Sequence, residues 1–314
     1  MAVATSLSTP ATSDRLDGRG VALAIGAYTL WGLFPAFWSL LAPAAPVEVL
    51  AHRIAWTAVL MVAVLSVLRG WGDLRALSLR GWAMTTSAAA LIAVNWGLFI
   101  YAVFTGHVVE SALGYFMSPL VSVLLGVLVL RERLRRAQVV ALVLATAAVG
   151  VITVENGSMP WIATTLALTF GLYSLIKSTV PLPTTASLTA EGLVLGPIAL
   201  GAVVWFELAG NGTFVDHGLG HTLLLIAGGA VTAVPLLLYG AAARRIPLST
   251  IGVLMYLNPV LQFLWGVLVV HEAMPASRWI GFVLVWVALV VFTADLVRHA
   301  RATRPRVAQS ISGS

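Results

Sequence analysis

Residues 116–132 read FMSPLVSVLLGVLVLRE, and residues 256–272 read YLNPVLQFLWGVLVVHE. The two stretches align without a gap, 140 residues apart, with a proline at the same place and a closing glutamate. Each supplies most of the roughly 20 apolar residues that a helix needs to cross the hydrocarbon core of a bilayer. The pair therefore predicts one membrane helix that occurs twice, once in each half of the chain.

The composition of the whole chain is that of a membrane protein. Of its 314 residues, 60% are hydrophobic and 10% are charged, and the mean hydropathy is +0.97, whereas soluble domains carry about 25% charged residues. The predicted fold class is an all-α integral membrane protein. The net charge of +6 does not indicate a nucleic-acid partner, because the basic residues stand in short segments between apolar runs. The absence of cysteine excludes disulfides, thiolate metal sites and cysteine nucleophiles.

Ten apolar stretches, separated by Pro, Gly or Arg clusters, are long enough to be membrane helices. They cover residues 20–40, 46–68, 81–103, 109–130, 136–153, 160–177, 187–207, 219–240, 248–270 and 277–297. Residues 1–18 and 299–314 are rich in small polar and basic residues, and we expect them to be disordered cytoplasmic tails.

The basic residues predict the orientation of these spans. All but two of the 18 Lys and Arg residues fall in the tails or in every second connection, the exceptions being Arg53 within a span and Arg278 in an opposite connection. Connections on the cytoplasmic side carry an excess of Lys and Arg. Both termini are therefore expected in the cytoplasm, and the expected location is a bacterial-type inner membrane.

The duplication extends beyond the two stretches quoted above. At an offset of 139, Trp31-Gly32-Leu33-Phe34 aligns with Phe170-Gly171-Leu172-Tyr173. We therefore expect two five-helix repeats, residues 19–153 and residues 158–298. Because five is an odd number of spans, the second repeat enters the membrane from the opposite side, and such inverted repeats are a common architecture of transporters. A duplication with a purely structural role is the alternative.

Four segments resemble one known family. They are Tyr28-Thr29-Leu30-Trp31-Gly32, Glu48-Val49-Leu50-Ala51-His52-Arg53, NWGLFIYAV at residues 95–103 and ESALGYF at residues 110–116. In these segments the chain is similar to the RarD-type permeases, in the EamA branch of the drug/metabolite transporter superfamily. The resemblance covers nearly the whole chain. It implies a ten-helix inner-membrane carrier with two EamA-like repeats, a small-molecule substrate and no ATPase subunit.

Few charged side chains fall inside the predicted spans, where each costs about 2.5 to 3.5 kcal/mol at the bilayer centre on insertion scales. The candidates for substrate binding or coupling are Glu48, His52, Arg53, Glu110 and Glu191. Glu48 and His52 are four residues apart on one helix face and are expected to pair. Arg53 can form an ion pair with Glu110, or it can hold a substrate carboxylate or phosphate at two points. The sequence leaves both roles of Arg53 open.

Proton coupling is suggested by two of these residues. Histidine titrates near physiological pH, so His52 is a candidate for exchanging a proton, with a purely structural bond to Glu48 as the alternative. At the offset of 139, Glu191 corresponds to His52 in the second repeat. For Glu191 we favour the simpler interpretation, a carboxylate near a helix start that reaches toward water.

Prolines at equivalent places in the two repeats, Pro119 and Pro259, predict helix kinks that border a central cavity. The ninth span has Asn258 before its proline, where the fourth has Ser118. Ordinary packing is the alternative role for the aromatic residues among the predicted cavity-lining set. That set consists of Trp31, Asn95, Tyr101, Tyr115, Ser118, Tyr173, Tyr239, Asn258 and Gln262.

Two other classes of protein fit the sequence less well. An intramembrane enzyme is disfavoured because no Asp lies in the middle of a span, and because there is no Gly-x-Ser-x-Gly elbow, Walker loop or zinc-binding helix. A channel or a non-transporting scaffold is the other alternative. The predicted function is a secondary transporter that moves a small polar or amphipathic metabolite or drug by alternating access, with proton coupling or exchange, and without a metal or cofactor.

Overall fold

The computed structural model describes residues 17–130 and 134–302. This part of the chain consists of thirteen helices and their connections, with no strand among these residues. Residues 1–16 and 303–314 of the predicted tails lie outside the described part, as do Arg131 and Glu132 of the repeated stretch. Residues 299–302, which were predicted to belong to the C-terminal tail, instead continue the last helix.

The helices follow the predicted spans closely along the chain. In the first half they are α1 (Gly18–Gly32), α2 (Phe34–Ser39), α3 (Pro46–Val67), α4 (Trp71–Arg75), α5 (Leu79–Phe104), α6 (Val108–Leu130) and α7 (Arg136–Asn156). In the second half they are α8 (Trp161–Thr179), α9 (Thr184–Leu208), α10 (Gly218–Ala243), α11 (Leu248–Leu254), α12 (Leu257–Leu268) and α13 (Ala276–Ala302).

All ten predicted stretches are helical, but two of them are broken. The first is divided at Leu33 into α1 and α2, and the ninth is divided at Met255 and Tyr256 into α11 and α12. Within the described residues, nine helical stretches are long and apolar enough to cross a membrane. Helix α8 is the predicted span outside this group, because its 19 residues include Lys177 and several threonines.

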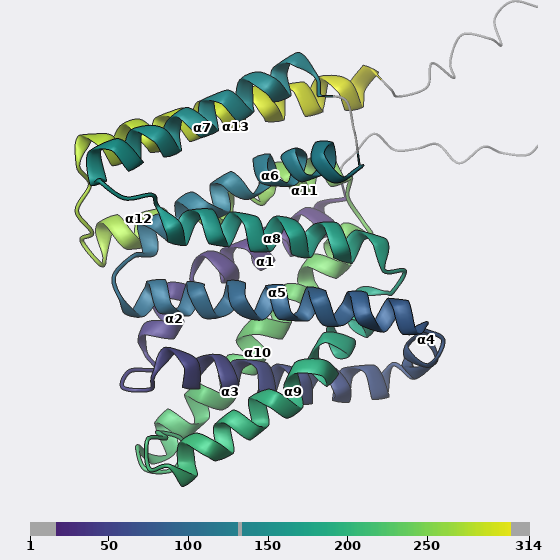
Figure 1. The fold of residues 1–314 in the computed structure, drawn as a ribbon. Coiled ribbons are helices and arrows are strands. Elements are labelled where there is room, and N and C mark those ends of the chain that lie inside the picture. The colour runs from purple at the N-terminus through teal and green to yellow at the C-terminus, as the bar shows by residue number, and fades with distance from the viewer. Residues whose placement is uncertain (1–16, 131–133, 303–314) are drawn as a thin grey trace, which may run out of the picture.

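The helices form one bundle in which most run along a common direction (Figure 1). Helices α7 and α13 lie side by side at one edge, and α3 packs against α9 and α10. Between these edges α6 packs against α8 and α12, α1 packs against α10 and α12, and α5 packs against α8. The start of α1 and the end of α13 lie at the same end of the bundle as α4 (Figure 1).

Glycines allow two of these helix pairs to approach closely. A Cβ atom at Gly229 of α10 would lie 2.5 Å from the backbone carbon of Trp56 in α3. A Cβ atom at Gly114 of α6 would lie 2.6 Å from the carbonyl oxygen of Ala163 in α8. Small residues at such crossings let helices pack tightly in lipid, where burial of apolar surface gives no driving force. Both contacts join the first half of the chain to the second.

The two helix breaks lie beside each other. A Cβ atom at Gly32, the last residue of α1, would lie 2.6 Å from Cβ of Leu261 and 3.2 Å from the carbonyl oxygen of Asn258 in α12. Pro35 and Pro259 follow the two breaks, and proline withholds a backbone donor at each. Interrupted helices in a transporter fold are a structural pointer to the binding site.

Candidate substrate site between the two halves

Arg53 is held in the interior of the bundle by aromatic rings. Its side chain, on α3, is 2% exposed. The guanidinium carbon lies 4.1 Å from the ring centre of Trp96, 4.9 Å from that of Trp38 and 5.3 Å from that of Phe34. Such cation–π contacts are each worth about 0.5 to 2 kcal/mol, the larger value applying when the cation is desolvated. The rings therefore offset part of the cost of burying the charge.

Within the described residues, the Arg53 side chain makes one hydrogen bond, and its partner belongs to the other half of the chain. Its Nε donates to Oγ1 of Thr232 on α10 at 2.9 Å. The Thr232 hydroxyl itself donates to the carbonyl oxygen of Gly228 at 2.9 Å, which leaves its lone pairs for Arg53. Nη1 of Arg53 is buried and has no hydrogen-bond partner in the described part of the chain. The guanidinium is thus oriented by one bond while its outer edge keeps free donors.

Of the two roles that the sequence left open for Arg53, the ion pair with Glu110 is not found. Within the described residues no carboxylate lies within 4.0 Å of Arg53. Oε1 of Glu110 instead accepts hydrogen bonds from the backbone nitrogens of Ile162, at 3.0 Å, and Ala163, at 3.4 Å. These are among the first backbone donors of α8, which have no partner within their own helix. Glu110 therefore caps α8 and leaves Arg53 without a counter-ion.

A second carboxylate has the same role at another helix. Glu272, in the connection between α12 and α13, accepts hydrogen bonds from the backbone nitrogens of Val108, at 2.5 Å, and Val109, at 3.1 Å, at the start of α6. Burial raises the pKa of Glu272, although these two bonds act in the opposite direction. The sequence indicated this residue only as the end of the repeated stretch.

The predicted pair of Glu48 and His52 is also wrong, because each residue has other partners. Oε1 of Glu48 accepts from the backbone nitrogen of Thr213, at 2.6 Å, and from its hydroxyl, at 2.9 Å. His52 accepts from Nε1 of Trp56 at 3.3 Å, and its ring stacks on Phe214 with centroids 4.7 Å apart. Both side chains hold the connection between α9 and α10 against α3.

Two residues of this region were missed by the sequence analysis. Thr213 lies between Glu48 and His221, whose Nε2 is 2.8 Å from the threonine hydroxyl. Thr213 lies outside the predicted spans, and His221 lies at the start of the span 219–240 without any motif that marks a site. Thr213 is distinguished by its contact with Glu48, 165 positions earlier in the chain, and His221 by its contact with Thr213.

From the sequence we expected the Glu191 carboxylate to reach toward water, but in the structure it does not. Its side chain is 7% exposed, and its Oε1 lies 2.8 Å from Nζ of Lys177. The hydroxyl of Tyr173 donates to Oε2 at 3.3 Å, and Lys177 also hydrogen-bonds to that hydroxyl. Lys177, predicted to lie at a span end, thus turns inward from the last turn of α8 to form a half-buried ion pair.

Comparison with known proteins identifies the family. Residues 18–154 match the model of the EamA-like transporter family. The chain is 51% identical to "Protein RarD" of Streptomyces exfoliatus, over 92% of each chain. It is 40% identical to "Uncharacterized transporter YojE" of Bacillus subtilis, over 91% of this chain and 97% of that one.

The chain belongs to the RarD-type transporters of the EamA family. It is 38% identical to "Protein RarD" of Escherichia coli over 91% of this chain and 97% of that one. A solved crystal structure matches its fold with a TM-score of 0.59 and 19% identity, over 89% of this chain and 98% of that chain. This RarD-type chain is a membrane transporter and a multi-pass protein of the inner membrane.

The predicted cavity-lining residues of the RarD-type chain fall into small groups. Tyr115 donates to the side-chain oxygen of Asn95 at 3.2 Å, and Asn95 donates in turn to the carbonyl oxygen of Leu166 at 2.9 Å. Gln262 donates to Asn258 at 2.8 Å, and its own Oε1 is buried without a partner in the described residues. The first group connects α5 and α6 to α8 of the second half, and the second group lies beside the break in the ninth span.

The aromatic members differ in their surroundings. The rings of Trp31 and Tyr239 lie 5.9 Å apart, and both pack against Tyr28. Tyr101 is 40% exposed and lies against Trp161, with ring centroids 6.1 Å apart. Trp31 and Tyr239 therefore join the two halves of the RarD-type fold, whereas Tyr101 lies at its surface.

The two equivalent prolines differ in their effect. Pro119 lies inside α6, which continues through it, and the neighbouring Ser118 donates to the carbonyl oxygen of Gly114 at 3.0 Å. Pro259 stands near the start of α12, directly after the break. Of this equivalent pair, Pro259 follows a helix break, whereas Pro119 lies within a continuous helix.

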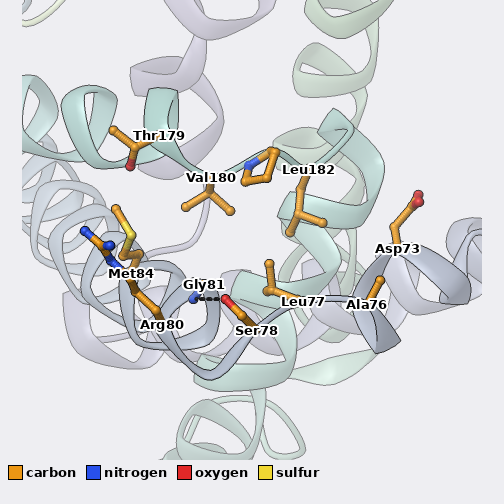
Figure 2. Close-up of a pocket in the computed structure, with 11 residues that line it drawn as sticks. Asp73, Ala76, Leu77, Ser78, Arg80, Gly81, Met84, Thr179, Val180 and Leu182 are labelled. Carbon is orange, nitrogen blue, oxygen red and sulfur yellow. Dashed lines mark hydrogen bonds between the residues drawn. The ribbon is translucent and has the colours of Figure 1, made fainter.

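Two surface cavities lie away from Arg53. One, of about 580 Å³, is bounded by the α4–α5 connection and the α8–α9 connection, and its residues include Asp73, Ser78 and Leu182 (Figure 2). Ser78 accepts from the backbone nitrogen of Gly81 there, because it caps α5 (Figure 2). The other cavity, of about 340 Å³, is bordered by Glu110. From Arg53 to the end of α3 is roughly 20 Å along the helix, so the first cavity is not part of the arginine site.

Proposed function

We propose that this chain is a secondary transporter that works by alternating access. In this proposal it crosses the inner membrane ten times, as two inverted five-helix repeats over residues 19–153 and 158–298, with both termini in the cytoplasm. Its substrate is a small polar or amphipathic metabolite or drug, moved by proton coupling or by exchange. The observation that carries the proposal is the position of Arg53, buried between the halves with no counter-ion among the residues that the structure describes.

The pattern of helix contacts supports the inverted repeats. The offsets in the sequence pair α1 with α8, α3 with α9, α5 with α10, α6 with α11 and α12, and α7 with α13. If each helix is replaced by its counterpart in the other half, the contact of α1 with α10 becomes the contact of α8 with α5. In the same way, the contact of α1 with α12 becomes the contact of α8 with α6, and all four contacts are present. The contacts α3–α9, α6–α12 and α7–α13 become themselves. A pseudo-two-fold axis between the repeats accounts for this pattern.

The arginine site lies between the two proposed repeats. Arg53 comes from α3 in the first repeat, and its hydrogen-bond partner Thr232 comes from α10 in the second. Substrate sites of inverted-repeat transporters lie at the interface of the repeats, and rocking of one repeat against the other exposes them to alternate sides. The aromatic rings around Arg53 suit a solute with an apolar part.

The crossing by α8 can be tested with single cysteines, since the chain has none of its own. Ser158 is exposed before α8 and Ser178 is exposed at its end. We expect Ser158→Cys to react with a membrane-impermeant maleimide in intact cells, and Ser178→Cys to react only after the membrane is permeabilised. Equal labelling of both variants from the outside would show that α8 does not cross.

Transport itself is tested by counterflow in proteoliposomes, with amino acids, their derivatives and amphipathic drugs as solutes. We expect saturable exchange of one solute class, because a carrier with a single central site must bind its solute before it reorients. Arg53→Ala should abolish this exchange, whereas Arg75→Ala, which removes an exposed arginine of α4, should preserve it. Folded protein that exchanges no solute would contradict the transporter proposal.

A further inference from the structure

The interior around Arg53 has an excess of hydrogen-bond donors. Three buried donor nitrogens have no acceptor in the described residues: Nη1 of Arg53, Nε1 of Trp38 and Nε1 of Trp265. Trp38 lies beneath the guanidinium, and Trp265 packs against the same core cluster. A buried donor without an acceptor costs about 1 to 3 kcal/mol. The site therefore lacks an acceptor group that a ligand would supply.

The site also has an excess of positive charge. Rings attract a cation through their quadrupole but carry no net charge, so the three ring contacts leave Arg53 with its full unit of charge. The nearest acid in the sequence, Glu48, stands five residues earlier on α3. It is turned by about 140° from Arg53 on an ideal helix; its Oε1 is occupied by Thr213, and its Oε2 is buried without a partner in the described residues. An unpaired buried charge of this kind is costly, and a bound anion would offset that cost.

We infer that the substrate of this transporter is a monocarboxylate with an apolar or aromatic body, bound through its carboxylate to the guanidinium of Arg53. This inference rests on the proposed function, because it assigns the solute class of the same site. Nε is held by Thr232, which leaves the two terminal nitrogens to donate in parallel to the two carboxylate oxygens. The apolar body then packs among the rings of Phe34, Trp38 and Trp96.

Charge and hydrogen-bonding capacity favour monocarboxylates over other classes of solute. One carboxylate balances the single charge of Arg53, whereas a phosphate dianion would leave one negative charge unpaired in the interior. An amine is repelled by the guanidinium and brings further donors to a site that already has donors without acceptors. A neutral amide offers one acceptor but no charge. Of these groups, the carboxylate satisfies both the terminal donors of Arg53 and its charge.

The test compares solutes that differ only in the charged group. Phenylacetate, phenylacetamide and phenethylamine share a ring and a short chain, and benzoate, indole-3-acetate and octanoate extend the carboxylate series. Each is added to the purified full-length protein in detergent, and the midpoint of thermal unfolding is measured. We expect at least one carboxylate to raise the midpoint in a saturable way, while its amide and the amine produce no shift. Ligands that bind only the folded state stabilise it by mass action.

Substitutions at Arg53 and Thr232 test whether the rise in the thermal midpoint comes from binding at Arg53. Arg53→Gln should weaken carboxylate binding at least tenfold, and Arg53→Lys, which keeps the charge but not the fork of donors, should weaken it less. Thr232→Val keeps the guanidinium and removes its anchor, so it should weaken binding without abolishing it, and it remains informative if Arg53→Gln fails to fold. Arg75→Gln is the matched control and should bind as the unchanged protein does.

Counterflow separates a failure of this inference from a failure of the proposed function. Saturable exchange of amines or amides, with no preference for carboxylates, would overturn the monocarboxylate assignment and leave the transporter intact. Stabilisation by none of the four carboxylates in folded protein would overturn the assignment as well. Exchange of no solute in any class would instead contradict the proposed function. Carboxylate-specific exchange that is lost in Arg53→Gln supports both.

Discussion

A single methyl group added at Gly229 is expected to separate α10 from α3 and to lower the free energy of unfolding by about 1 to 3 kcal/mol. The added Cβ of Gly229→Ala would lie 2.5 Å from the backbone carbon of Trp56 and 2.8 Å from the backbone nitrogen of Thr57. Backbone atoms cannot rotate away as a flexible side chain can, so the two helices must move. Thr232 lies one turn further along α10 and would move with them, which weakens its bond to Arg53.

Gly220→Ala is the matched control on the same helix, since a Cβ atom there meets nothing within 4 Å. Because alanine favours a helix by up to about 1 kcal/mol over glycine, the control should unfold at the same temperature or a slightly higher one. The measurement is the thermal midpoint of each variant in detergent, followed by the fraction that remains monodisperse. A Gly229→Ala protein as stable as the control would show that the close crossing of α10 and α3 is not needed.

Removal of the Glu191 carboxylate is expected to have an effect of similar size. In Glu191→Ala the ammonium of Lys177 and the hydroxyl of Tyr173 lose their shared acceptor inside the bundle. Breaking a buried pair by removing one partner costs about 3 to 5 kcal/mol, and because the side chain of Lys177 is 26% exposed we expect a value near the lower limit. The measurement is again the thermal midpoint in detergent.

Two further variants decide how this loss arises. Lys177→Met combined with Glu191→Gln removes both charges and keeps an acceptor for Tyr173, so it should recover most of the lost stability. Glu155→Ala removes an exposed acid near the end of α7 and should change the midpoint little. If Glu191→Ala is as stable as Glu155→Ala, the ion pair with Lys177 does not stabilise the fold. The interpretation drawn from the sequence, a carboxylate that reaches toward water, would then be correct.

The site was predicted from the sequence in part. Intramembrane charge is costly, and this alone singled out Glu48, Arg53, Glu110 and Glu191. The partners of these residues were predicted incorrectly, because depth along a span says how far into the bundle a side chain lies and not which helix faces it. Glu110 and Arg53 enter from the same predicted side, yet the carboxylate turns to α8 and the guanidinium to α10.

The helix breaks were also predicted from the sequence only in part. Proline predicts that a backbone donor is missing, and this was readable at Pro119 and at Pro259. Whether the helix then continues depends on its neighbours: α6 continues through Pro119, whereas the ninth span breaks just before Pro259, where it contacts the end of α1 at Gly32.

From the sequence alone we predicted ten helical stretches, an internal duplication and a family resemblance. These depend on the apolar length and order of residues, which are local properties of the chain. The tertiary structure alone decided the partners of the buried charges. Arg53 bonds to a residue 179 positions away, Glu48 to one 165 away and Glu110 to one 52 away. Only the packing of distant helices determines which of several possible partners lies within a hydrogen bond.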